Sequence, residues 1–181
     1  MSTFDAAQES LMRPGTVGVI PTDTIYGVVA RAADQEAVDR LYQLKKREHK
    51  PGTIVAANIE QLVNLGIKRR YLKAVEHLWP GPLSVEIPNT IDYLNQSTGR
   101  QAFRLPNDRV LTQLLLIVGP LLTTSANEPG KPTANTVDDA QLYFGESVDF
   151  YVDGGDLSGR LPSTIIGYRN FRVGFGSSVR P

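Results

Sequence analysis

The 181-residue sequence predicts an α/β fold built around a mixed β-sheet. About eight short runs of β-branched and apolar residues are interleaved with about five amphipathic segments of helical periodicity. Some predicted strands follow one another closely, as in hairpins, and others are separated by a helix. We therefore expect antiparallel and parallel pairs in one sheet. A chain of this length fits one domain, so we expect residues 1–181 to form a single domain.

The charge balance and the residue types exclude several classes of protein. The 19 Lys and Arg residues equal the 19 Asp and Glu residues in number, which argues against a general nucleic-acid-binding protein. The sequence has no cysteine, which excludes disulfides, thiolate catalysis and zinc–thiolate sites and is compatible with the reducing cytoplasm. No segment approaches the roughly 18 apolar residues of a membrane span, and the first residues lack a signal-peptide pattern. We therefore expect an unprocessed cytoplasmic protein without a membrane partner.

The first predicted elements lead to a polar tip. Residues 4–12 predict a short amphipathic helix. A β-branched strand follows at 17–20, and Pro21 ends it because proline has no N–H for a sheet ladder. Three oxygen-bearing side chains at 22–24 then precede a second apolar run at 25–30. These three side chains are therefore held at the end of a strand, where ligands often bind.

The next segment predicts a helix that ends in a cluster of cations. Asp34 is a suitable N-cap, and Glu36 places negative charge in the first turn. The helix ends in Lys45, Lys46 and Arg47. A strand, an oxygen-rich tip and such a helix could hold a small polar molecule beside an anion. The alternative is a solvated helix end, in which the cations only complement the helix dipole.

The middle of the chain predicts further strands and helices. Asn58 and Gln61 resemble a capping pair at the start of one helix, and Pro80 ends another. Arg104 lies in a short strand whose alternation directs it either to solvent or into a cleft. In order, we expect a strand at 53–57, helices at 59–65 and 68–79, a strand at 83–87, a polar loop at 88–99, a strand at 101–105 and a helix at 107–118.

A second cluster of small polar residues follows a strand at 121–124. The stretch TTSANEPGKPTANT, residues 123–136, places Ser125 and Asn127 with several backbone donors at another strand end. Its Gly-Lys-Pro-Thr is not a P-loop, because the required glycine spacing is absent. The alternative is a plain turn that leads into a helix at 136–144, which Thr136 and Asp139 would cap. The remaining chain predicts a strand at 150–153, a Gly-rich loop at 154–159 and a hairpin with strands at 161–167 and 171–175.

Seven short motifs occur in order along nearly the whole chain. They are PTDTIYG (21–27) followed by Lys45-Lys46-Arg47 and Lys50-Pro51, then WPGPL (79–83), FRLP (103–106), SAN (125–127) with GKPT (130–133), DGG (153–155), STI (163–165) and Arg180-Pro181. Together these motifs resemble the YrdC family, the threonylcarbamoyl-AMP synthases, in its short single-domain form. A single motif would be weak evidence for this family, but the ordered set at comparable spacing is specific for it.

The resemblance implies a twisted open sheet with flanking helices around a central, positively charged cavity. It implies an enzyme that joins L-threonine, bicarbonate and ATP into threonylcarbamoyl-AMP and pyrophosphate. This nucleotidyl transfer begins the t6A modification of tRNA, so a downstream tRNA-modifying transferase complex would receive the product. The matching catalytic positions are Lys45, Arg47, Ser125 and Asn127; the threonine positions are Thr24, Arg104, Thr123 and Ser163; the ATP positions are Arg47, Lys50, Arg100, Ser125, Thr133 and Arg180.

The residue types suit that chemistry. A carboxylate formed from threonine and bicarbonate must attack the α-phosphate of ATP. Lys45, Arg47 and Lys50, with Mg²⁺ carried by ATP, would offset the converging negative charge, and we expect no protein-ligated metal. The planar fork of Arg104 suits the threonine carboxylate. Asp23 is the nearest candidate to take a proton from the amine, and the alternative for Asp23 is a turn-capping role.

Some positions depart from the family pattern, and two other functions stay open. Glu48 follows Arg47 where proline is usual, and the spacing from Arg47 to Lys50 is one residue shorter than usual. Gly52 and Arg100 replace a common leucine and threonine. The first alternative function is an RNA-binding module that holds tRNA, if only weakly, in the cavity. The second is a carbamoyl-transfer domain without synthase activity.

Overall fold

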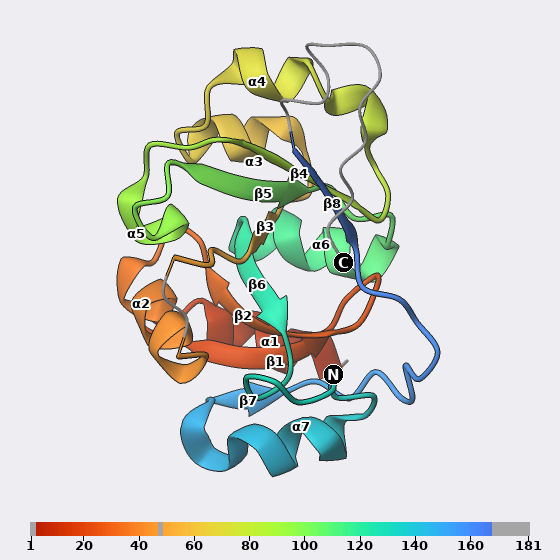
Figure 1. Ribbon diagram of the computed structural model, residues 1–181. Helices are drawn as coiled ribbons and strands as arrows, with labels where there is room; N and C mark the ends of the chain where they lie inside the picture. Colours follow the sequence, from red (N-terminus) through yellow and green to blue (C-terminus); the bar gives the residue numbers. More distant parts are fainter. Residues whose placement is uncertain (1–2, 47–48, 168–181) are drawn as a thin grey trace.

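An eight-stranded mixed sheet forms the centre of the structure (Figure 1). The computed structural model describes residues 3–46 and 49–167. The strands are β1 Val17–Pro21, β2 Tyr26–Arg31, β3 Thr53–Val55, β4 Leu83–Pro88, β5 Arg100–Arg104, β6 Leu121–Ser125, β7 Phe150–Tyr151 and β8 Thr164–Gly167. They lie in the order β7-β1-β2-β6-β3-β5-β4-β8. The β1/β7, β3/β5 and β4/β8 pairs are parallel and the other pairs are antiparallel, which confirms an open mixed sheet.

Helices flank the sheet on both faces (Figure 1). In the described ranges, the α-helices are α1 Thr3–Leu11, α2 Gln35–Leu44, α3 Ile59–Asn64, α4 Arg69–Lys73, α5 Asp92–Asn95, α6 Arg109–Val118 and α7 Val137–Phe144. Two short 3-10 helices, η1 at Glu76–Leu78 and η2 at Gly145–Ser147, follow α4 and α7. The α/β fold class is therefore confirmed, with more helical segments than the periodicity indicated.

Local capping interactions set several of the helix starts. The Asp34 carboxylate accepts from the backbone N–H of Ala37 at 3.1 Å, as expected for the N-cap of α2. Asn58 accepts from the N–H of Gln61 at 3.0 Å at the start of α3. Thr136 and the third residue of α7 form a reciprocal capping box. These are short-range contacts, so the sequence alone predicted them correctly.

Alternating residues of the central strands build a core on each face of the sheet. In β2, Val28 and Ala30 belong to the larger core, which α2 covers, whereas Val29 belongs to the core that α1 and α6 cover. All three side chains are fully buried. Burial on both faces explains why β2 is a continuous apolar run and not an alternating one.

The expected helix at 68–79 was wrong, because the structure divides it into α4 and η1. Leu72 and Val75 are its fully buried residues and lie three positions apart, and the N–H of Val75 donates to the carbonyl of Leu72 at 3.1 Å. This i to i−3 bond is the 3-10 type. Trp79 is extended before Pro80, as proline requires of the preceding residue. Tertiary burial therefore overrode the helical periodicity.

The polar loop expected at 88–99 was also wrong in part, because it contains α5. Leu94 and Asn95 are both fully buried in this helix. The Asn95 amide donates to the carbonyl of Asn89 at 2.7 Å, so a polar side chain is buried through a hydrogen bond. Polar composition alone suggested solvent exposure. Of the expected C-terminal hairpin, the first strand is shortened to β8, and the second, at 171–175, lies outside the described residues.

Candidate functional site

A cavity of about 180 Å³ lies where loops from both halves of the sheet meet. Hydroxyl-bearing side chains dominate its wall. The lining residues are Thr22, Thr24, Ile25, Tyr26, Gly27, Pro51, Gly52, Thr53, Arg104, Thr123, Thr124, Ser125, Pro162, Ser163 and Ile165. All four predicted threonine-binding residues are among them, and so is Ser125. Among the described lining residues only Arg104 is charged, so this wall is less basic than the resemblance implied.

Two glycines in the wall allow strands to approach each other closely. A Cβ atom on Gly27 would lie 2.5 Å from the Thr123 hydroxyl oxygen. A Cβ atom on Gly52 would lie 2.6 Å from the Thr123 carbonyl oxygen. Real Cβ atoms do not reach such distances, so a side chain at either position would displace Thr123 from the wall. The Gly52 that departs from the family pattern therefore fits the space available.

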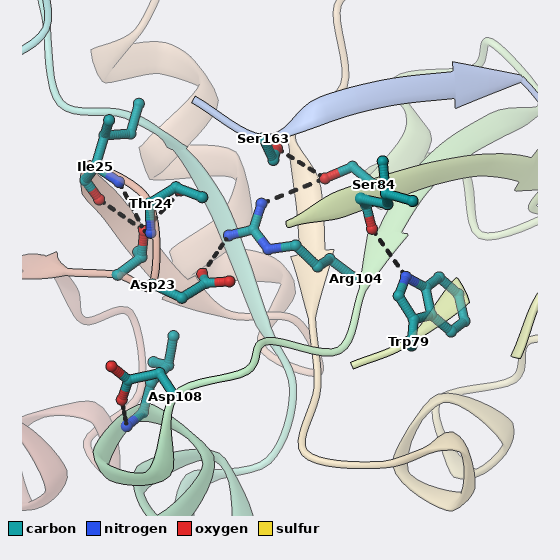
Figure 2. A network of polar contacts seen from close by, with 11 residues as sticks. Asp23, Thr24, Ile25, Trp79, Ser84, Arg104, Asp108 and Ser163 are labelled. Carbon is teal, nitrogen blue, oxygen red and sulfur yellow. Dashed lines mark hydrogen bonds and ion pairs between the residues drawn. The ribbon is translucent and has the colours of Figure 1, made fainter. Parts of the chain in front are cut away.

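The turn between β1 and β2 is organised by a threonine hydroxyl. The Thr22 hydroxyl donates to the carbonyl of Ile25 at 2.7 Å and accepts from the N–H groups of Thr24 and Ile25, each at 3.2 Å. Thr22 therefore caps this turn, while the Asp23 carboxylate accepts a hydrogen bond from Arg104, and the turn-capping role considered for Asp23 stays a prediction. The side chain of Asp23 is left to point out of the turn towards β5 (Figure 2).

Asp23 and Arg104 form a buried ion pair. An Nη2 hydrogen of Arg104 is donated to Asp23 Oδ1 at 3.0 Å, and the two side chains are only 3% and 7% exposed for Arg104 and Asp23. Arg104 also donates from Nη1 to the Ser84 hydroxyl at 3.3 Å, whereas its buried Nε has no partner (Figure 2). Of the two directions that strand alternation allowed for Arg104, the structure selects the cleft.

Burial dominates the ionisation of this pair. Burial raises the pKa of Asp23 above its usual value, although the Arg104 charge and hydrogen bond lower it. Burial lowers the pKa of Arg104, against the opposing effect of Asp23. A carboxylate with a raised pKa is a better proton acceptor. Asp23 is not among the described residues that line the cavity, however, so its position favours holding Arg104 over contacting a ligand.

Lys45 joins the end of α2 to the loop after β6. Its ammonium donates to the carbonyls of Ser125, at 2.7 Å, and of Asn127, and to Asn127 Oδ1 at 2.9 Å. The Ser125 hydroxyl donates to the same Oδ1 at 2.7 Å, and the Asn127 amide donates to the carbonyl of Lys131 at 2.7 Å. Lys45 is 3% exposed, so it is a buried structural contact as well as a cation. The predicted meeting of the two motifs therefore occurs.

The other predicted nucleotide positions lie apart from the cavity wall. Lys50 is exposed, and its backbone N–H donates to the Gln96 side chain at 2.8 Å. Arg100 begins β5, at the end opposite Arg104, and its guanidinium forms an ion pair with Glu86. Thr133 is half-buried in the loop that follows β6. The remaining predicted site residues, Arg47 and Arg180, lie outside the described residues.

The residue that sequence reasoning missed is Ser84. It lies in β4 one position before Val85, which pairs with Phe103 of β5. Its hydroxyl contacts both Arg104 and Ser163, and the side chain is fully buried. A serine next to Val85 on the buried part of a strand is a signal that could have identified it, because buried hydroxyls need hydrogen-bond partners.

Residues 3–46 and 49–167 contain neither a cluster of metal ligands nor a membrane-spanning helix. No group of three or more His, Cys, Asp or Glu side chains in these ranges could hold a metal ion. No helix there combines the length and the apolar composition needed to cross a membrane. The cavity and the Lys45 cluster therefore carry the candidate chemistry of the described residues.

Comparisons with known proteins identify the family of this chain. A protein-family model named Sua5/YciO/YrdC, described as "Telomere recombination", matches residues 10–175. A threonylcarbamoyl-AMP synthase of Pseudomonas fluorescens (strain Pf0-1) is 34% identical over 97% of this chain and 95% of its own length. A protein with the same name from Stutzerimonas stutzeri (strain A1501) is 32% identical over 94% of this chain and 93% of its own.

A solved structure extends the comparison to three dimensions. P. abyssi Sua5 complexed with L-threonine matches with a TM-score of 0.78 and 27% identity, over 91% of this chain. This chain spans about half of that Sua5 chain, since it covers 50% of its length. Because a family model matches most of the residues and full-length relatives exceed 30% identity, the chain belongs to the Sua5/YciO/YrdC family.

Proposed function

We propose that this protein is an L-threonylcarbamoyladenylate synthase, a nucleotidyltransferase that converts L-threonine, bicarbonate and ATP into threonylcarbamoyl-AMP and pyrophosphate. The observation that carries this proposal is one shared residue. Ser125 lines the cavity that contains Arg104, and its carbonyl accepts a hydrogen bond from Lys45. An amino-acid-sized space therefore adjoins a buried cation, as a reaction between an amino acid and a polyphosphate requires. The names of the relatives support the same activity.

The cavity suits threonine better than a nucleotide. Its volume of about 180 Å³ lies below the ~300–1,000 Å³ typical of sites for larger ligands. Arg104 would bind the substrate carboxylate, because it lines the cavity and its donor fork matches a carboxylate. The hydroxyls of Thr24 and Thr123 would bind the substrate ammonium and hydroxyl groups, and the Ser163 hydroxyl would act with Arg104 on the carboxylate. The solved relative with bound L-threonine supports this assignment.

The chemical step would be an adenylation without a covalent enzyme intermediate. The nitrogen of threonine first adds to bicarbonate with loss of water, which gives an N-carboxylate. That carboxylate attacks the α-phosphorus of ATP, a P–O bond forms, and the bond to pyrophosphate breaks. Lys45, Ser125 and Asn127 would hold the reacting groups, and Lys45 would offset their charge. The nucleotide roles of Arg47, Lys50, Arg100, Thr133 and Arg180 stay predictions.

Mg²⁺ would accompany ATP and is part of the proposal. The described residues offer no cluster of protein ligands for it, so the phosphates of ATP would supply its ligands. The ion would neutralise part of the phosphate charge. The residues of this chain would position threonine and the loop after β6.

The product implies partners and a location. Threonylcarbamoyl-AMP is an activated acyl phosphate, so a tRNA-modifying transferase would consume it, and t6A-containing tRNA would be the final product. A cytoplasmic location and a single-domain organisation over 1–181 belong to the same proposal; the continuous sheet of the described residues supports the latter. The alternatives, RNA binding and carbamoyl transfer, gain no support from this cavity, whose only charged lining residue in the described ranges is paired with Asp23.

Pyrophosphate release tests the proposal directly. We expect release from ATP only when both threonine and bicarbonate are present. Lys45→Ala and Ser125→Ala should be strongly impaired, whereas Lys73→Ala, an exposed lysine on α4, serves as the matched control with normal activity. Equal ATP turnover without threonine would refute the assignment. An RNA affinity that falls steeply with salt, in a protein without synthase activity, would favour the RNA-binding alternative.

A further inference from the structure

The buried hydroxyl of Ser84 connects two residues of the candidate threonine site. Arg104 Nη1 lies 3.3 Å from Ser84 Oγ, and Ser84 Oγ lies 2.9 Å from Ser163 Oγ (Figure 2). Ser84 itself is 0% exposed and does not line the cavity, whereas Arg104 and Ser163 both do. The three residues come from β4, from β5 and from the segment just before β8. Ser84 can therefore influence a ligand only through its two neighbours.

The chemistry of these groups fixes the direction of the hydrogen bonds. A guanidinium has only donors, so Ser84 must accept from Arg104. A serine hydroxyl has a single proton, and among the described residues Ser163 is the other hydrogen-bond partner that the Ser84 hydroxyl has. Keeping that buried proton unused would be costly. Ser84 therefore donates to Ser163, and acceptance from a charged donor strengthens this donation.

This direction determines what Ser163 offers to a ligand. Because Ser163 accepts from Ser84, its own proton is not used in that bond and stays available on the cavity side. Arg104 lines the same cavity, so its guanidinium contributes a second donor group to the wall. A wall with a hydroxyl donor beside a guanidinium donor suits a carboxylate, which has only acceptors.

We propose that Ser84 is a positioning residue for the substrate carboxylate. It accepts from Arg104, and so restrains the guanidinium on the side opposite Asp23. It also donates to Ser163, and so makes Ser163 a donor towards the ligand. The proposal rests on the proposed threonine-binding function. It deepens that function by naming a residue outside the wall that determines selectivity for a carboxylate over a neutral group.

The test compares Ser84→Ala with Ser84→Thr, which keeps the hydroxyl. Threonine binding is measured by calorimetry, and the KM values for threonine and ATP by pyrophosphate release. We expect Ser84→Ala to raise the Kd and KM for threonine about five- to tenfold, as for the loss of one or two hydrogen bonds, with the KM for ATP unchanged and Ser84→Thr close to wild type. Ser10→Ala on α1, which removes the exposed hydrogen bond that Arg13 donates to Ser10, is the matched control.

A second readout separates positioning from a purely structural role. L-threoninol lacks the carboxylate, so the ratio of its Kd to the Kd of threonine measures carboxylate recognition. This ratio should shrink about five- to tenfold in Ser84→Ala and stay unchanged in Ser10→Ala. Should Ser84→Ala not fold, Ser84→Cys keeps the shape with a weaker donor and must shift the ratio in the same direction. A folded Ser84 variant without its hydroxyl that keeps the wild-type ratio would overturn the proposal.

The two proposals fail in different ways. If the wild type binds threonine but releases no pyrophosphate, the synthase function fails, and calorimetry on the variants still tests Ser84. If the wild type is an active synthase and Ser84→Ala binds threonine normally, only the role of Ser84 fails. An equal rise in the KM for threonine and in the KM for ATP in Ser84→Ala would also overturn the role of Ser84, because it would show general damage to the site.

Discussion

Substitution of Asp23 by alanine should destabilise the protein far more than loss of a surface charge. In the wild type the Arg104 guanidinium is 3% exposed and donates to Asp23 at 3.0 Å. Asp23→Ala leaves this charge buried without a counterion. Although burial lowers the pKa of Arg104, a guanidinium with an ordinary pKa above about 12 stays protonated at neutral pH. The variant therefore cannot relieve the cost by losing a proton.

The magnitude follows from the burial of both partners. Breaking a buried ion pair by removing one partner costs about 3–5 kcal/mol. A domain of 150–250 residues loses roughly 2–4 °C in Tm for each kcal/mol. The Tm of Asp23→Ala should therefore fall by roughly 6–20 °C. Asp23→Asn keeps the shape and an acceptor oxygen, so it should be less damaging than Asp23→Ala.

The reciprocal variant, Arg104→Met, should behave differently because a carboxyl group can take up a proton. Burial already raises the pKa of Asp23, and loss of the cation raises it further. The folded state then binds a proton more tightly than the unfolded state. Stability of Arg104→Met should consequently decrease as the pH rises from about 4 through the raised pKa, by at most about 1.4 kcal/mol per pH unit.

Urea unfolding of the single and double variants measures these effects. Asp138→Ala, which removes an exposed carboxylate from α7, is the control and should change stability little. The double variant Asp23→Ala/Arg104→Met should be more stable than Asp23→Ala alone, because replacing a whole buried pair by apolar groups is often neutral. A loss below about 1 kcal/mol in Asp23→Ala, as for a surface pair, would refute the reasoning.

Two further predictions concern the first strand and the cavity wall. Partial burial opposes ionisation of Asp149, but hydrogen bonds from Arg40 and from the N–H of Val17 lower its pKa overall. The free energy of unfolding of the wild type should exceed that of Asp149→Asn by less than about 1 kcal/mol, since the Asp149 and Arg40 side chains are 34% and 38% exposed. This advantage is present above the ordinary pKa of aspartate and should vanish in urea titrations as the pH falls through the lowered value; an advantage that grows in acid would contradict it. Gly27→Ala places Cβ 2.5 Å from the Thr123 hydroxyl and should cost about 1–3 kcal/mol and raise the KM for threonine, whereas an unchanged KM would show that the wall adapts.

Local patterns were sufficient where the deciding contacts lie within a few residues. The cap of α2 at Asp34 and the capping box of α7 at Thr136 depend on residues at i and i+3, and both were predicted. The family resemblance, carried by the ordered motifs, also indicated that the end of α2 and the end of β6 would meet. Lys45 and Ser125 are in contact, as that resemblance implied.

The surroundings of Arg104 illustrate what the sequence alone did not determine. Strand alternation allowed either solvent or a cleft for Arg104, and the sequence suggested a proton-accepting or a turn-capping role for Asp23, not an ion pair. Asp23 is separated from Arg104 by 81 positions, and Ser84 by 20. These residues meet only because β4 and β5 pair while the turn after β1 lies at the same end of the sheet.

The sequence by itself determined the fold class, the helix caps and the family. Periodicity and capping reflect energies between neighbouring residues, and motif order identifies relatives, so neither needs coordinates. Only the tertiary structure decided that Arg104 is buried against Asp23, that Ser84 supports it, and that the helix at 68–79 breaks. The physical reason is that burial and ion pairing depend on which distant segments the sheet brings together, and a local pattern does not contain that information.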